Sequence, residues 1–280
     1  MFGRERPSSV LCPSCGSLVG IRDDRCLNCG RVRPGLFGLA PFLRALGQDG
    51  GFVAVVLWAC GALYLATLAV EPDAISSSGI LSFLSPGNRS LLLFGASGVV
   101  PVFAWGRWWT PLSAGWLHAG LLHIGFNMMA LRTLGPLTTH VYGTARTFII
   151  YTLAGVAGFA ASSVAGYLHL PWTGLFTLGA SAGLFGLIGA LVYYGRRGGN
   201  RALREAAIRW ALSGLAFGFF FRGIDNWAHI GGLAGGYLVA RWLDPLLPER
   251  GDHVLMALGL LLLSAASIVA SVAAGLPRGF

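Results

Sequence analysis

Long apolar stretches without charge constrain this chain more than any other feature of its sequence. Residues 52–70 and 254–275 contain no Asp, Glu, Lys or Arg. Each, as a helix, is long enough to cross a hydrocarbon core of about 30 Å. Charged residues make up 11% of the chain and hydrophobic residues 55%, whereas soluble domains are about 25% charged. The sequence therefore predicts an integral membrane protein.

Further apolar segments predict seven membrane helices and an all-α polytopic fold. The long connection at 71–118 is apolar in patches and rich in tryptophan, which suits a loop lying in the membrane interface. The predicted helices cover residues 52–70, 119–138, 145–168, 181–194, 206–221, 227–243 and 253–275.

The distribution of arginines predicts how these helices are oriented across the membrane. All 20 basic residues are arginine. If the N-terminus is cytosolic, sixteen of them, including Arg132 and Arg146, fall in or next to the inside loops. This bias follows the positive-inside rule and predicts an N-terminus in the cytosol.

Four cysteines near the N-terminus form two C-x-x-C pairs, Cys12 with Cys15 and Cys26 with Cys29, and each pair is followed by glycine. This spacing is typical of a tetrahedral zinc site. Two disulfides or a redox pair are the alternatives, but a segment of about 30 residues builds little core, so a metal staple is the better explanation. Thiolate-bound zinc also implies a reducing compartment. The sequence thus predicts a structural Zn²⁺ in a ribbon at 1–33.

Ser181 stands in the stretch GASAG, at the head of a short predicted helix. Arg196 marks the cytosolic end of that helix fifteen residues later, a distance of about 22 Å. The hydrocarbon core is thicker, at about 30 Å, so Ser181 is expected several ångströms below the outer surface, after a loop that dips into the membrane. Irregular backbone at that depth has to be buried in protein or face a water-filled cavity.

Three further polar residues are predicted at a similar depth. His229 lies twelve residues before Arg241, about 18 Å from the same border. His123 and Asn127 are four residues apart and share a helix face in the outer half of their helix. A serine hydrogen-bonded to a histidine is an activated nucleophile, and an imidazole with an amide can form an oxyanion hole.

Each of these residues alone has a simpler explanation. A serine in a membrane helix usually bonds to its own backbone or packs in a seam of small residues. His229 could be a buried core histidine or a metal ligand, and Asn127 could join two helices. Polar groups inside a membrane are costly and usually functional, so their coincidence at one depth favours a catalytic site.

Taken together, the motifs resemble those of the rhomboid family of intramembrane serine proteases, over about residues 51–245. The G-x-S motif lies at Gly179–Ser181, H-x-x-x-N at His123–Asn127, and A-H-x-x-G-x-x-x-G at Ala228–Gly236. Any one of these motifs is weak, and the ordered set is specific.

The resemblance implies a catalytic dyad of Ser181 and His229 without a third carboxylate. It implies an oxyanion hole built from His123, Asn127 and the backbone N–H of Ser181. It also implies a six-helix core followed by one extra C-terminal membrane helix within 246–280.

The surroundings of the dyad extend the resemblance. Phe185 is one helical turn after the serine and is expected to pack against the catalytic imidazole. His118 and Gly179 are expected to support the site, and Gly232 and Gly236 are expected to let helices approach closely.

Two positions depart from the family pattern. Many rhomboids carry Trp-Arg in the first loop, whereas here Trp109 is followed by Thr110, so the stabilising role of that arginine is either lost or supplied elsewhere, with Arg107 as a candidate. Many also have glycine directly after the nucleophile, where this chain has Ala182. Alanine is compatible with the start of a helix, so activity is expected to persist.

The predicted function is therefore a serine endopeptidase that needs no cofactor for catalysis and cleaves single-span or polytopic membrane proteins near the outer face. A catalytically inactive relative that holds membrane proteins is the alternative. A transporter would show paired broken helices, and only one dipping loop is found. The ribbon lacks stacking aromatics, which argues against nucleic acid as a partner.

The predicted organisation is a cytosolic zinc ribbon at 1–33, a linker at 34–50, a rhomboid core at 51–245 and a seventh membrane helix within 246–280. The resemblance places such a protein in the lipid bilayer of a bacterial cytoplasmic membrane. The oligomeric state is not specified by the sequence.

Overall fold

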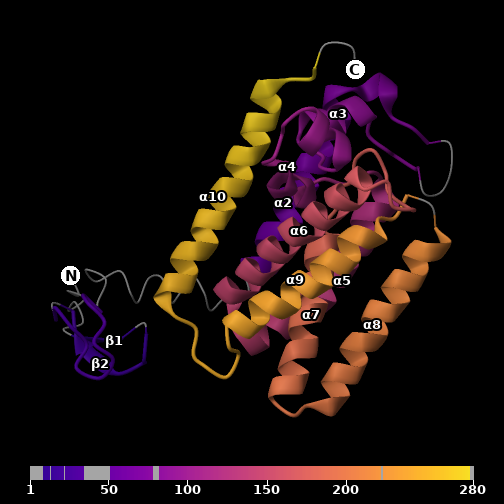
Figure 1. Cartoon of the computed structure of the whole chain (residues 1–280). Helices are drawn as coiled ribbons and strands as arrows, with labels where there is room; N and C mark the ends of the chain where they lie inside the picture. The colour runs from indigo at the N-terminus through magenta and orange to yellow at the C-terminus, as the bar shows by residue number, and fades with distance from the viewer. Residues whose placement is uncertain are drawn as a thin grey trace, which may run out of the picture.

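The computed structural model describes residues 9–12, 14–21, 23–34, 51–77, 82–221 and 223–277. Within these residues the chain forms a bundle of seven long helices with a small β-hairpin beside it (Figure 1). This is the architecture of an all-α polytopic membrane protein, as predicted. The predicted linker at 34–50 lies outside the described residues except for Pro34.

The seven long helices coincide with the seven predicted segments, with two notable differences at their ends. The second predicted helix continues past residue 138 and ends only where Gly143 adopts a left-handed φ of +85°. The fifth begins five residues before the predicted 206, because the Asn200 side chain caps it by accepting from the N–H of Leu203 at 3.0 Å. The helices are α2 (Gly51–Val70), α5 (Leu121–Tyr142), α6 (Thr144–Tyr167), α7 (Ser181–Arg197), α8 (Arg201–Phe220), α9 (Asn226–Trp242) and α10 (Gly251–Ala274).

Helices α6, α7 and α9 form the centre of the bundle. Buried residues occur on every side of α6, as expected for a helix that is apolar all round. Among the described residues, α2, α6 and α10 are long and apolar enough to cross a membrane by composition. Helices α7 and α9 have 17 residues each, and the small residues along them allow tight packing against α6.

The segment at 71–118, predicted as an interfacial loop, contains short helical pieces that pack against the end of α10 (Figure 1). The indole of Trp109 donates to the hydroxyl of Ser271 at 3.0 Å, and Ser264, Ser267 and Ser271 are buried along one face of α10. The outermost helix is therefore attached to the loop rather than free in the bilayer. The pieces are η2 (Pro72–Ala74), α3 (Asn88–Leu93), η3 (Val100–Ala104), α4 (Thr110–Ser113) and η4 (Ala114–Trp116).

Two arginines that the orientation argument counted in or next to the inside loops lie within helices. Arg132 is in the middle of α5, because that helix extends to Tyr142. Arg146 is buried in the first turn of α6. Its guanidinium donates to the carbonyl oxygens of Asp244 (3.0 Å) and Leu247 (2.8 Å) after α9. Arg146 thus ties the α9–α10 connection to the core.

The hairpin of β1 (Ser9–Leu11) and β2 (Leu18–Gly20) lies beside the beginning of α10 (Figure 1). Arg31 makes a two-pronged ion pair with Asp252 in the first turn of α10. The same guanidinium donates to the hydroxyl of Ser14 at 2.9 Å, and the pairing with Asp252 raises the pKa of Arg31. Arg31 therefore connects the cysteine-bearing segment to the helical bundle.

Candidate active site

Ser181 is the first residue of α7, and the loop before it is held in place by a backbone hydrogen bond. The N–H of Gly179 donates to the carbonyl of Ala114 in η4 at 2.9 Å. Gly179 has a φ of +126°, and a Cβ there would lie 2.6 Å from Nε2 of His123. Glycine at 179 therefore lets the loop pass directly over the His123 ring. As the first helical residue, Ser181 has a backbone N–H without an intrahelical acceptor, at the positive end of the helix.

His229 lies in the first turn of α9 and faces Ser181. Its Nε2 is 2.9 Å from the Ser181 hydroxyl oxygen, 48 residues away in the sequence. The imidazole stacks on the ring of Phe185 at 4.2 Å between centroids and 10° between planes, and it is 6% exposed. The stacking on Phe185 and the hydrogen bond to Ser181 together fix the orientation of the imidazole. These are the residues and contacts that the sequence predicted.

Asp225 does not reach the imidazole and has a different task. Its carboxylate accepts from the N–H of Ala228 at 3.0 Å and so caps α9. The other oxygen bonds with the hydroxyl of Ser162 on α6. Nδ1 of His229 has no hydrogen-bond partner among the described residues. The geometry is that of a serine–histidine pair without a third carboxylate.

Close contact between α7 and α9 sets the separation of serine and histidine. A Cβ on Gly232 would lie 2.1 Å from the carbonyl oxygen of Ala182, and one on Gly236 would lie 2.0 Å from that of Gly186. No real Cβ atom tolerates such a contact, so any side chain at these positions pushes the helices apart. The two glycines of the third motif are thus a geometric condition for the 2.9 Å contact between Ser181 and His229.

His123 on α5 presents a ring nitrogen to the same place. Its Nδ1 accepts from the N–H of Ala119 at 3.2 Å, so in the neutral ring the proton is on Nε2, which faces the loop at Gly179. The Asn127 side chain donates one N–H to the carbonyl of His123 at 2.8 Å, leaving its second N–H available. Of these groups, Nε2 of His123 lies beside the loop that carries Ser181.

His118 is fully buried behind His123. The centroids of the two rings are 5.1 Å apart and their planes make an angle of 65°. Among the described residues, neither ring nitrogen of His118 forms a hydrogen bond. Its ring packs on the ring of His123.

Thr110 and Arg107, where the first loop differs from the family pattern, interact with other residues of the same loop. The hydroxyl of Thr110 donates to the carbonyl of Arg107 at 2.9 Å. Arg107 is buried, donates to the carbonyl of Leu92 at 3.3 Å and lies over the Trp105 ring at 5.2 Å. Arg107 therefore stabilises the loop itself and does not contact the serine or histidine.

Sequence reasoning missed how the first loop holds the serine loop. The backbones of Ser97 and Thr177 exchange two hydrogen bonds, at 3.0 and 2.7 Å, and the N–H of Val100 donates to the carbonyl of Leu175 at 3.1 Å. These contacts join irregular segments about 80 residues apart. No local pattern announces such a pairing.

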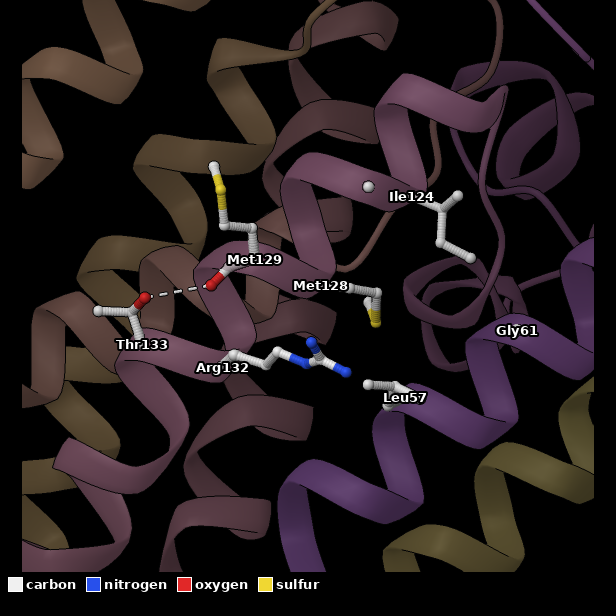
Figure 2. Close-up of a pocket in the computed structure, with 8 residues that line it drawn as sticks. Leu57, Gly61, Ile124, Met128, Met129, Arg132 and Thr133 are labelled. Carbon is white, nitrogen blue, oxygen red and sulfur yellow. Dashed lines mark hydrogen bonds between the residues drawn. The ribbon is translucent and has the colours of Figure 1, made fainter.

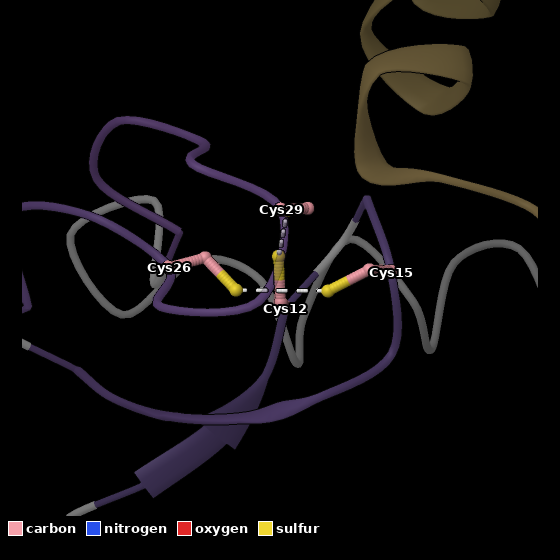
Figure 3. A group of neighbouring side chains, drawn as sticks. All are labelled: Cys12, Cys15, Cys26 and Cys29. Atoms are coloured by element: carbon pink, nitrogen blue, oxygen red, sulfur yellow. Dashed lines mark hydrogen bonds between the residues drawn. The ribbon is translucent and has the colours of Figure 1, made fainter.

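The four cysteines of the N-terminal segment converge on one point (Figure 3). Their sulfur atoms all lie within 4.8 Å of one another, with separations of 3.7 Å for Cys12 and Cys29 and 3.6 Å for Cys15 and Cys26. A tetrahedron of thiolates at the usual zinc–sulfur distance of 2.3 Å has edges of about 3.8 Å. The four residues therefore fit one tetrahedral metal ion, and the described cysteines form no disulfide.

A comparison with known proteins identifies the family of this chain. Residues 105–244, which carry all three motifs, match the Rhomboid domain family. The chain belongs to the rhomboid family. The match includes Ser181, His229, His123 and Asn127 and therefore the whole candidate site.

Several curated relatives are rhomboids as well. Rhomboid protease GluP of Bacillus subtilis is 36% identical over 189 residues, which cover 66% of this chain and 34% of that protein. Putative rhomboid protease YdcA of the same organism is 29% identical over 142 residues, covering 48% and 67%. RHOMBOID-like protein 4 of Arabidopsis thaliana is 29% identical over 172 residues, covering 56% and 39%. The chain spans about a third of the length of GluP and less than half of RHOMBOID-like protein 4.

Proposed function

We propose that this rhomboid is an intramembrane serine endopeptidase in which Ser181 and His229 form the catalytic dyad. The observation that carries the proposal is the 2.9 Å contact between the Ser181 hydroxyl and Nε2 of His229. A hydroxyl at this distance from an imidazole nitrogen can transfer its proton as it attacks. The stacked Phe185 ring and the close contact of α7 with α9 support the same assignment.

The reaction uses groups already in place. His229 takes the proton of Ser181 as the serine oxygen attacks the scissile carbonyl carbon. The Ser181 N–H, Nε2–H of His123 and the free N–H of Asn127 stabilise the oxyanion. His229 then protonates the leaving amine, the C–N bond breaks, and an acyl-enzyme remains. Water, deprotonated by His229, attacks the ester and releases the new carboxyl group and Ser181.

The proposed substrates are transmembrane segments cleaved near the outer face. A helix hides its amide groups in internal hydrogen bonds, so it has to unwind locally before cleavage. Segments with Gly or Pro near the cleavage site unwind at least cost. We propose that the substrate enters between α5 and α8. There the rings of Phe126 and Phe217 contact each other, with 6.4 Å between their centroids.

The test compares the full chain with Ser181→Ala in liposomes that contain a labelled single-span substrate. We expect cleavage by the wild type, and a fall of at least about 10⁴-fold in the variant, because loss of the nucleophile removes the acyl-enzyme route. Products are measured by gel and mass spectrometry. Equal cleavage by the two proteins would exclude Ser181 as the nucleophile.

A catalytically inactive protein that holds membrane clients is the second possibility. It would bind substrate helices without cleaving them, and the wild type and Ser181→Ala would then retain an intact substrate equally. The position of His123 favours the protease, because its Nε2 faces the loop that carries Ser181, and a binding site needs no hydrogen-bond donor beside a serine hydroxyl.

We further propose that Cys12, Cys15, Cys26 and Cys29 bind a structural Zn²⁺, because their spacing fits a thiolate tetrahedron. Purified wild type is expected to contain one zinc per chain by atomic emission. A double variant, Cys12→Ser with Cys26→Ser, is expected to contain none, because two thiolates no longer close the site. Cys60→Ser, a buried cysteine of α2, is the control that keeps the metal. Stoichiometric zinc in the double variant would contradict the assignment.

A further inference from the structure

A hollow of about 510 Å³ lies between α2 and α5, and exposed residues of α5 form part of its lining. Its walls are apolar apart from Arg132 and Thr133. A Cβ on Gly61 of α2 or on Gly125 of α5 would meet nothing within 4 Å, so the space beside these two glycines is open. An open apolar hollow on the outside of a membrane protein is filled by lipid chains or by another helix.

The hollow has a charged end and an apolar end. Figure 2 shows the guanidinium of Arg132 reaching from α5 toward Leu57 on α2. Ile124, at the other end of the lining, is eight residues before Arg132, about 12 Å along the helix axis. One leaflet contributes about 15 Å, half of the hydrocarbon core. The hollow is therefore close to one leaflet in length and has its cation at one end.

Helices α5, α7 and α9 run in the same direction. His123, in the first turn of α5, lies beside Gly179, which comes just before α7 begins. At the other end of α5, the hydroxyl of Tyr142 donates to the carbonyl of Ala190 in α7 at 2.9 Å. Helix α9 follows α7 in parallel, because its dyad histidine and its later glycines meet successive turns of α7. Residues equally far along these three helices therefore lie at similar depth.

Arg132 is close to the membrane face toward which these helices run. It lies nine residues beyond His123. Arg196 of α7 and Arg241 of α9 lie 15 and 12 residues beyond the dyad residue of their own helix and mark that face, which is cytosolic in the predicted orientation. Arg132 is thus three to six residues short of this level, or about 5–9 Å. A long arginine side chain can carry its charge over such a distance to the headgroup region.

Arg132 has no anionic partner within the described part of the chain. Its guanidinium makes no ion pair or hydrogen bond among the residues that the structure describes. A basic pocket between membrane helices on the cytosolic side is a typical site for an anionic lipid headgroup. The polarity of the hollow fits this occupant, because a phospholipid of that leaflet has its phosphate at the surface and its chains toward the centre of the bilayer.

We propose that the hollow between α2 and α5 binds one anionic phospholipid of the cytosolic leaflet, with its phosphate on Arg132 and an acyl chain extending toward Gly61 and Gly125. The N–H groups of the guanidinium donate to the phosphate oxygens. The flexible side chain of Met128, which lines the hollow, adapts to the acyl chain. A lipid held in this way joins α2 to α5, and the proposal does not depend on protease activity.

The test uses the full chain in a mild detergent with a small amount of photoreactive phosphatidylglycerol. One probe carries a diazirine at the end of an acyl chain, and a second carries it next to the headgroup. Mass spectrometry then locates the labelled residues. We expect the chain-end probe to label the hollow near Gly61 and Gly125, and the headgroup probe to label it near Arg132. The reverse order, or labelling no greater than on the rest of the apolar surface, would overturn the proposal.

Competition measures the preference for negative charge. Unlabelled phosphatidylglycerol should displace the probe from the hollow about fivefold more effectively than phosphatidylcholine, because one arginine near the surface favours an anionic lipid by about that factor. Glycerol phosphate, which has no acyl chain, should not compete at the same concentration. Equal competition by the two phospholipids, or competition by glycerol phosphate, would contradict an anionic lipid as the occupant.

Two variants separate the charge from the space. Arg132→Gln should keep the labelling but lose the preference for phosphatidylglycerol. Gly125→Leu should fill the hollow and lower the labelling by at least about fivefold, and it should fold, because its Cβ meets nothing within 4 Å and leucine has the higher helix propensity.

Arg209→Gln is the matched control. Arg209 is likewise exposed, on α8, and does not line the hollow, so this variant should keep both the labelling and the preference. Thermal unfolding checks that each variant is folded. A preference that survives Arg132→Gln, or undiminished labelling in folded Gly125→Leu, would overturn the proposal.

Discussion

His229→Ala is expected to lower kcat/KM for a membrane substrate by about 10³- to 10⁴-fold while the helical bundle remains folded. The reason is that, among the described side chains, only His229 forms a hydrogen bond with the Ser181 hydroxyl, at 2.9 Å. Asp225 is occupied in capping α9. The measurement is cleavage kinetics in liposomes, with circular dichroism to confirm that the variant is folded.

Two further variants make the His229 result interpretable. His140→Ala removes an exposed histidine from the last turn of α5, far from the serine in the chain, and should retain full activity. His229→Gln keeps a polar side chain of similar size, so it guards against a loss caused by an unfilled space, and it should be as inactive as His229→Ala. Substantial activity in either His229 variant would show that another group acts as the base.

Gly232→Ala is the second variant with a large expected effect. The added Cβ would lie 2.1 Å from the carbonyl oxygen of Ala182, so α9 has to move away from α7. Overpacking of this kind costs about 1–3 kcal/mol. The same movement separates His229 from Ser181, and a displacement of about 1 Å lowers the rate by about 10²-fold. Thermal unfolding and cleavage kinetics on one preparation test both effects.

Gly259→Ala is the control, because it is expected to leave the stability of the protein unchanged or to raise it. Gly259 is inside α10, and a Cβ there would meet nothing within 4 Å. Alanine has the higher helix propensity, so this variant should be unchanged or more stable by up to about 1 kcal/mol. Equal destabilisation by the two substitutions would mean that the α7–α9 contact does not determine the stability of the site.

The sequence contains enough information to predict the helices and the meeting of serine and histidine. Predominantly apolar stretches mark the helices, which are 17 to 24 residues long, and arginines at the ends of α7 and α9 give the depth of Ser181 and His229. What it misjudges is the end of α5. The helix passes through Pro136 and continues to Tyr142, so Arg132, predicted in the last two turns of a helix, lies in its middle.

Contacts between distant segments escape prediction for a physical reason. The pairing of Ser97 with Thr177 joins two irregular loops, and the ion pair of Arg31 with Asp252 spans 221 residues. Neither leaves a periodic signal, because each depends on the position of both backbones in the finished fold. The cysteine cluster, by contrast, is local, and its C-x-x-C spacing is sufficient to predict that the four sulfurs meet.

Covalent labelling of the nucleophile tests the central proposal most directly. A fluorophosphonate probe reacts with a serine oxygen only when a neighbouring base activates it, forming an O–P bond and releasing fluoride. In liposomes we expect one probe per wild-type chain, located on Ser181 by mass spectrometry, and no label in His229→Ala or Ser181→Ala. A wild-type chain that remains unlabelled, or labelling of Ser181 that persists without His229, would contradict the dyad.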